Sequence, residues 1–257
     1  MRLLLSLKEK NNHIEYQLAF LSIVLISLSK ASNFTSVFVL LGIAPLFAIY
    51  DQYLHKKVHT LKFIGLIGLS LILSFCCWQI LEGHFNFEVF TQALLHGALM
   101  AISLVLYWFT DKYARNRIGF FTVIIYWLAL EYCSLLIDYT PSFMILGGVL
   151  SNWGTSIAWH TETGWLGISA WIITGNILFY YVFFKDLAIF NGRFRVLTLI
   201  YVVLFLSLPF IYGYFSANST SLVEMNISAS EEYLGRTAMW VTALLLSYGF
   251  VKSKVKK

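Results

Sequence analysis

One carboxylic acid stands inside an apolar stretch of this sequence and is the first residue that could do chemistry. Glu131 lies in the run 118–137, within the segment YWLALEYCSLL, about two helical turns from the end of that run. A carboxylate among apolar neighbours is costly, so Glu131 should be neutral or paired and should face the interior of a helix bundle. Two interpretations stay open. Glu131 could meet a lipid head group or relay a proton, or it could make a structural hydrogen bond to a neighbouring helix.

A histidine is the second candidate. His96 lies in the apolar run 89–109, and Gln92 precedes it by one helical turn. A single histidine on an apolar helix is more typical of a hydrogen-bonded interior residue than of a ligand or a base, so we rank both residues below Glu131. The three cysteines also lie in apolar runs and predict neither a disulfide framework nor a metal site. No metal and no cofactor is expected. The cysteines are Cys76, Cys77 and Cys133.

The segment 138–164 is too apolar for a solvated loop and too interrupted for a spanning helix, because Pro141, Gly147, Gly148 and Gly154 punctuate it. Irregular backbone near membrane depth persists where it packs on protein or lines a wet cavity. We therefore expect a re-entrant or interfacial segment over the outer mouth of the bundle. It would line either a polar pocket for lipid or an aromatic belt with no ligand. The candidate pocket residues are Glu131, Trp153, Trp159, His160, Glu162, Gly164, Gly167, Ser169 and Asn176.

Asn176 lies near the middle of the run 165–184 and needs a hydrogen-bond partner. We expect that partner to be Glu131, because a bond between the amide and the carboxyl would offset part of the desolvation of both groups. Small residues let helices approach closely. Gly164 and Gly167 are therefore expected to bring the two helices together.

Membrane helices must position these residues. The chain has 257 residues, of which 59% are hydrophobic and 12% charged, whereas about a quarter of the residues in ordinary globular domains are charged. Apolar runs of roughly 17–25 residues can span a bilayer. We predict an all-α, polytopic integral membrane helical bundle forming a single transmembrane domain over 1–257, in which Pro45 kinks or ends the second helix. The eight expected helices lie at about 15–31, 34–50, 61–81, 89–109, 118–137, 165–184, 196–215 and 236–251.

The basic residues predict the orientation. With the N-terminus in the cytoplasm, the inside segments carry 15 of the 18 Lys and Arg residues. Such a bias predicts that both ends of an eight-helix chain are cytoplasmic. It also accounts for the net charge of +5 through topology and anionic lipids, so nucleic acid is not an expected partner. The inside segments are 1–14, 51–60, 110–117, 185–195 and 252–257.

Four stretches of the sequence resemble the apolipoprotein N-acyltransferase family, most of all its forms from Bacteroidetes-type bacteria. They are WLALEY (127–132), LGG (146–148), AWHTETGWLGISAWIITGNILFY (158–180) and EEYLGRTAMWVTALLLSYGFVKSKVKK (231–257). The resemblance implies eight helices with both ends cytoplasmic, in the bacterial cytoplasmic (inner) membrane. Members of the family move an acyl chain from phospholipid to the N-terminal cysteine of a lipoprotein. The matching positions are Glu131, Gly147, Trp159, Glu162, Thr163, Gly164, Gly167, Ser169, Asn176, Gly235 and Arg236.

The chain departs from the family where the chemistry is done. The family carries a nitrilase-like domain with a Glu-Lys-Cys triad between its seventh and eighth helices, whereas here the short outer loop 216–235 holds neither Cys nor Lys. In the family, the acyl chain passes through a thioester on the cysteine of this triad. Without that nucleophile the thioester cannot form. The resemblance therefore implies a catalytically incomplete scaffold that binds phospholipid or lipoprotein and docks a membrane or periplasmic protein partner. The alternative is an acyltransferase that uses membrane-embedded residues or a catalytic partner in trans.

Overall fold

The computed structural model describes residues 13–55, 58–81, 83, 86–114, 119–137, 144–157, 160–185, 188, 196–216 and 229–255. Every regular element within these ranges is helical, which confirms the predicted all-α class. The first half of the chain forms α2 (Ile14–Leu28), η1 (Thr35–Phe38), α3 (Val39–Gly42), α4 (Ala44–Leu54), α5 (Thr60–Leu81) and α6 (Phe87–Ala114). The second half forms α7 (Phe121–Leu136), η3 (Leu146–Ile157), α8 (His160–Phe179), η4 (Tyr180–Phe184), α9 (Val196–Ser216) and α10 (Ala229–Val255).

Five of the described helical segments are long and apolar enough to cross a membrane. Three shorter apolar helices accompany them, at Ile14–Leu28, Phe121–Leu136 and Val196–Tyr212. Together these segments coincide with the eight apolar runs of the sequence, so the chain has the helical make-up of a membrane protein. The number of helices that cross the bilayer and the side of each terminus stay predictions. The five long segments are Thr35–Leu54, Thr60–Leu81, Phe87–Tyr113, Thr163–Phe184 and Glu231–Lys254.

The second apolar segment is broken near its middle. Helix α3 ends at Gly42 and α4 begins at Ala44, with Pro45 in the first turn of α4. Proline has no backbone N–H and fits the first turn of a helix, where that donor has no partner in any case. The expected interruption at Pro45 is therefore present, and it falls just before the proline.

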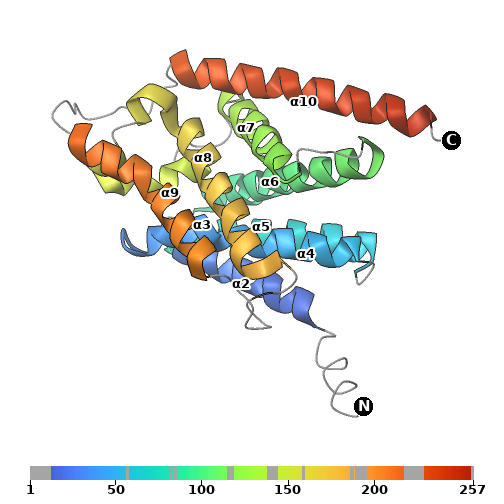
Figure 1. Cartoon of the computed structure of the whole chain (residues 1–257), viewed down its shortest axis with the longest axis horizontal. Helices are drawn as coiled ribbons and strands as arrows, with labels where there is room; N and C mark the ends of the chain where they lie inside the picture. The colour runs from blue at the N-terminus through green and yellow to red at the C-terminus, as the bar shows by residue number, and fades with distance from the viewer. Residues whose placement is uncertain are drawn as a thin grey trace, which may run out of the picture.

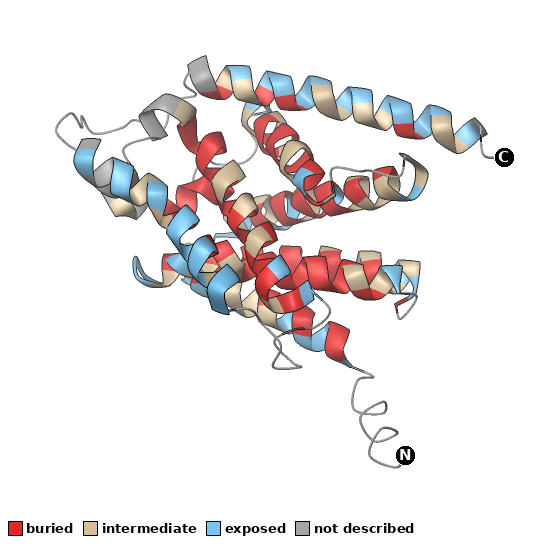
Figure 2. Ribbon diagram, in the orientation of Figure 1, coloured by how far each residue is buried: buried red, intermediate tan, exposed pale blue. Residues whose placement is uncertain are grey.

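The outer helices carry large apolar faces away from the core. Helix α10 lies along one edge of the molecule beside α6 and α7 (Figure 1), and much of its surface and that of α9 is exposed (Figure 2). Large exposed apolar surfaces mark contact with a membrane or with another protein. The interior is closely packed around large side chains, among them Phe47, Phe63, Phe75, Trp78 and Trp127.

Two predicted boundaries change. Helix α10 starts at Ala229, so the eighth helix begins before the expected residue 236 and occupies the end of the predicted loop 216–235. Helix α8 starts at His160, before the expected residue 165. Within the predicted segment 138–164, residues 144–157 and 160–164 are described, and the first of these two ranges contains the 3₁₀ helix η3. Runs of 3₁₀ helix longer than three or four residues are uncommon, and η3 has 12 residues. The backbone of residues 146–157 is therefore irregular, and the re-entrant or interfacial placement of the segment stays a prediction.

Candidate functional site

The carboxyl group of Glu131 binds the beginning of η3. Its Oε1 atom accepts hydrogen bonds from the backbone N–H of Leu146, at 2.8 Å, and from the indole N–H of Trp127, at 2.9 Å. The Glu131 side chain is 0% exposed. The first amides of a helix have no partner within it, and Glu131 supplies one from α7. Of the two interpretations of Glu131, these contacts favour the structural hydrogen bond. Its partners are the backbone of η3 and Trp127 of its own helix, α7.

Ser169 of α8 also accepts a hydrogen bond from the beginning of η3. Its buried hydroxyl oxygen accepts the backbone N–H of Gly147 at 2.8 Å, and the residue lies against the Glu131 carboxyl. A Cβ atom at position 147 would overlap the carbonyl oxygen of Trp165, so only glycine lets η3 approach α8 this closely. Residues from α7 and α8 therefore satisfy the first two amides of η3.

Trp153 fixes the same helix farther along. Its indole N–H lies 3.0 Å from the carbonyl oxygen of Asn33 and also contacts the hydroxyl of Ser36. Its ring packs against Phe210 of α9, with ring centroids 5.1 Å apart. Trp153 thus joins η3 to the segment between α2 and α3, a role that its prediction as a pocket residue did not include.

Asn176 enters the break between α3 and α4. Its Oδ1 accepts the backbone N–H groups of Ile43 (2.7 Å) and Ala44 (3.0 Å), while its Nδ2 donates to the carbonyl oxygens of Val39 (2.8 Å) and Ile172 (2.9 Å). In an uninterrupted helix the N–H of Ile43 would bind the carbonyl of Val39. The amide of Asn176 takes the place of that bond and satisfies both groups.

The predicted bond between Glu131 and Asn176 is therefore wrong. Two hydrogen bonds to each end of its amide already engage Asn176, and all four go to backbone atoms. Glu131 lies at η3 instead. Both side chains need hydrogen-bond partners, as expected, and both bind backbone groups where a helix begins or is interrupted. Burying an unpaired backbone N–H or C=O group is about as costly as burying an unpaired polar side chain, so the hydrogen bond between them removes both costs.

A second buried carboxylate lies where α8 is interrupted. Gly164 has φ 66° and ψ −178°, so the helix breaks there and resumes at Trp165. The carboxyl oxygen Oε1 of Glu231, from α10, accepts the backbone N–H of Trp165, and Glu231 is buried. A Cβ atom at position 164 would overlap the Glu231 side chain. Glu231 was not among the predicted site residues, although it stands at the start of the stretch 231–257.

The glycines of α8 therefore do not join α7 to α8 as predicted. Gly164 faces Glu231 of α10, and a Cβ at Gly167 would overlap Thr163 of its own helix. The close approach to α7 comes instead from Gly235 of α10, where a Cβ would overlap the ring of Tyr132. The glycine spacing correctly indicated close packing, but the neighbours of each glycine depend on how α8 and α10 cross.

The weaker candidates lie in α6. His96 is buried, and its ring stands edge-on to Phe75 of α5 with centroids 4.8 Å apart. Neither ring nitrogen has a hydrogen-bond partner among the described residues. Gln92 is half-buried, one turn earlier on the same helix. Of the other predicted residues, Trp159 lies outside the described residues, and so do the side chains of His160 and Glu162.

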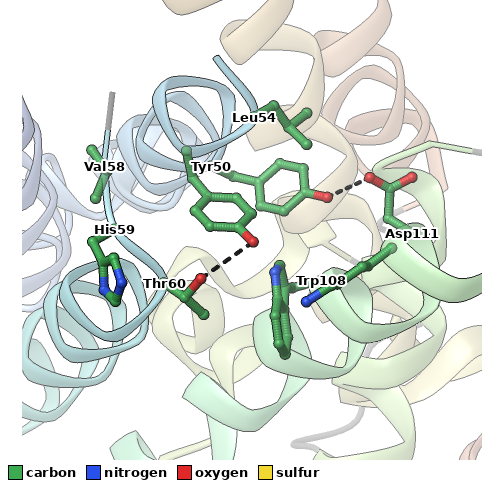
Figure 3. A pocket seen from close by; sticks show the side chains of 9 residues that line it. Tyr50, Leu54, Val58, His59, Thr60, Trp108 and Asp111 are labelled. Atoms are coloured by element: carbon green, nitrogen blue, oxygen red, sulfur yellow. Dashed lines mark hydrogen bonds between the residues drawn. The ribbon is translucent and has the colours of Figure 1, made fainter. Parts of the chain in front are cut away.

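A cavity of about 500 Å³ lies elsewhere, between the ends of α4 and α6 and the beginning of α5 (Figure 3). None of the predicted site residues lines it. Aromatic residues are common at the ends of membrane helices, so their spacing alone gave no signal of a pocket. In the described part of the chain, no group of three or more His, Cys, Asp or Glu side chains is arranged to hold a metal ion.

Comparisons with protein families, with curated proteins and with solved structures give no match for this chain. The residues themselves therefore carry the functional argument.

Proposed function

We propose that this protein is a membrane scaffold, a catalytically incomplete relative of the apolipoprotein N-acyltransferases that binds lipid or lipoprotein and docks a partner protein. One observation carries the proposal. Glu131, Ser169 and Asn176, the polar residues with the strongest claim to chemistry, all bind backbone groups of interrupted helices. These side chains hold η3 and the break between α3 and α4 in place.

The geometry of Glu131 supports a structural role over a catalytic one. A general base must come within hydrogen-bond reach of the proton that it removes. The Glu131 side chain is fully buried, and one of its oxygens already accepts two N–H groups. Moving the carboxyl toward a substrate would leave the amide of Leu146 unpaired in an apolar interior, which is costly.

The proposed docking end is the one at which η3, the interruption of α8 and the start of α10 meet. Glu231 joins α10 to α8, and Glu131 and Ser169 join η3 to α7 and α8. The connection between α9 and α10 is the place where the resemblance puts the family's catalytic domain. A fixed platform at this end suits a protein that presents a lipid-bearing chain to a partner.

The test uses a defined probe, a synthetic lipopeptide with a diacylated N-terminal cysteine. The full-length protein in lipid nanodiscs carries a photo-crosslinking residue at Tyr233, which is 77% exposed near the start of α10. A matched control carries it at Tyr248, near the other end of the same helix. Saturable crosslinking from position 233, with little from position 248, is expected. Crosslinking equal to that of the same peptide without lipid would refute the proposal.

A further inference from the structure

The cavity shown in Figure 3 lies at the opposite end of the molecule from Glu231. Gly249, near the end of α10, packs on Phe109 and Thr110 of α6, one turn or less from the cavity residue Asp111. Glu231 stands at the other end of α10. The cavity is thus separate from the polar cluster around η3. Its lining residues include Tyr50, Tyr53, Leu54, Trp108, Asp111 and Lys112.

The cavity lies where three candidate membrane spans end. The spans Thr35–Leu54 and Phe87–Tyr113 finish beside it, and Thr60–Leu81 begins there. Where such helices cross a bilayer, their ends lie at the level of the lipid head groups. A ligand of this cavity that belongs to the membrane would therefore present its head group to it.

Opposite charges line the cavity without pairing. Asp111 accepts a hydrogen bond from the hydroxyl of Tyr50, which holds the carboxylate in the wall. The ammonium of Lys112 lies 5.0 Å from the centre of the Trp108 ring. Within the described residues, Asp111 and Lys112 do not form an ion pair with each other. A ligand with one positive and one negative group can therefore meet both charges.

The aromatic walls favour the positive group of such a ligand. The rings of Tyr50 and Tyr53 line the same cavity as Asp111, whereas the Trp108 ring already has the Lys112 ammonium beside it. Cations bind over aromatic faces, and more strongly where water is partly excluded. A phosphate would be attracted to the ammonium of Lys112. The volume of about 500 Å³ falls within the range of small-molecule sites, roughly 300–1,000 Å³.

We propose that this cavity binds the head group of a zwitterionic phospholipid, with its phosphate at Lys112 and its ammonium between Asp111 and the rings of Tyr50 and Tyr53. The glycerol and acyl chains would leave past Leu54, which is 51% exposed at the cavity edge. Free phosphoethanolamine shares the head-group chemistry, so the experiment includes it. The site is independent of the proposed scaffold function.

The test measures lipid retention by the full-length protein in detergent, using native mass spectrometry with equal amounts of phosphatidylethanolamine and phosphatidylglycerol. The second lipid has the phosphate but lacks the ammonium. We expect the wild-type protein to retain roughly tenfold more phosphatidylethanolamine, the discrimination that one charged hydrogen bond supplies. Equal retention of the two lipids would overturn the proposal without any variant.

Two variants separate the two charges. Asp111→Asn keeps an oxygen for the Tyr50 hydroxyl, and it should reduce phosphatidylethanolamine retention to the level of phosphatidylglycerol. Lys112→Gln should weaken both lipids equally. The matched control is Lys254→Gln, which removes a lysine lying over another aromatic ring, Phe250. An unchanged preference in Asp111→Asn, or an equal effect of Lys254→Gln and Lys112→Gln, contradicts the assignment.

A third arm identifies the source of the ligand. Free O-phosphoethanolamine is added in competition with the lipid. Displacement only at much higher concentration than the lipid supports a membrane ligand, since the acyl chains then contribute to binding. If the free compound binds as tightly as phosphatidylethanolamine does, the lipid assignment is wrong and the ligand is soluble.

Discussion

At the scale of single residues, several buried polar side chains of this protein complete the hydrogen bonding of broken backbone. Glu131 and Ser169 bind the first amides of η3, and Glu231 binds the amide that follows the break in α8. Water is scarce inside a bilayer, so a buried amide without a partner there costs about 1–3 kcal/mol. Glu131 and Ser169, which were candidates for chemistry from the sequence, therefore serve as hydrogen-bond acceptors for backbone amides.

Glu131→Gln should leave the protein nearly as stable as the wild type, because the amide oxygen can still accept both N–H groups. Glu131→Leu removes the acceptor of Trp127 and Leu146. It should lower the free energy of unfolding by about 1–3 kcal/mol, the cost of unpaired buried donors. Unfolding titrations in mixed micelles measure both variants. Equal losses in the two would show that the carboxyl charge, rather than the acceptor, matters.

Gly164→Ala should be more damaging than an ordinary glycine replacement. Position 164 has a positive φ, and an added Cβ would overlap the side chain of Glu231. The strained backbone alone costs about 1–3 kcal/mol. Gly68→Ala is the matched control, because Gly68 lies in α5 with open space around its Cβ position, and alanine favours a helix there. Thermal unfolding in detergent should show a loss for the first variant only.

At the scale of elements, one side chain joins two helices that are far apart in the sequence. Asn176 of α8 replaces the missing bond between Ile43 and Val39 at the break between α3 and α4. A side chain that inserts into the hydrogen-bond ladder is one of the recognised causes of a helix break. The interruption thus depends on two residues: Pro45 in the first turn of α4, and Asn176 of α8, which binds the unpaired backbone groups.

Asn176→Ala should lower the free energy of unfolding by about 2 kcal/mol, because four hydrogen bonds are lost and each polar contact inside a bilayer averages about 0.6 kcal/mol. The control, Thr174→Ala, removes a bond within the same helix, from the Thr174 hydroxyl to the carbonyl of Ala170. It should change stability little. Steric trapping or an SDS titration measures both. A loss no larger than that of Thr174→Ala would mean that the break does not depend on Asn176.

The elements could be predicted from the sequence because hydropathy is a local property. Each of the eight apolar runs contains an apolar helix, and the irregular stretch after α7 contains η3. The partners of Asn176 could not be predicted in this way, since they lie 132 to 137 residues away for three of its four bonds. Glu231 was missed for the same reason, because its role depends on a break in another helix.

At the scale of the whole molecule, the exposed faces of α9 and α10 and the basic clusters of the sequence both indicate a bilayer around the bundle. The predicted orientation places Lys112 and Lys254 on the cytoplasmic side and Tyr233 on the other. Single cysteines at these three exposed positions, in a protein lacking its three native cysteines, test it with an impermeant thiol reagent. Labelling from outside the cell should reach position 233 alone, and labelling of position 112 would refute the topology.

In the proposed function, the buried polar residues that bind backbone build a scaffold and perform no acyl transfer. The most direct measurement is the mass of the diacylated lipopeptide after incubation with the purified full-length protein and phospholipid. We expect the lipopeptide to bind and to keep its mass, both with the wild-type protein and with Glu131→Gln. A gain of one acyl chain with the wild-type protein, lost in the stable Glu131→Gln variant, would contradict it.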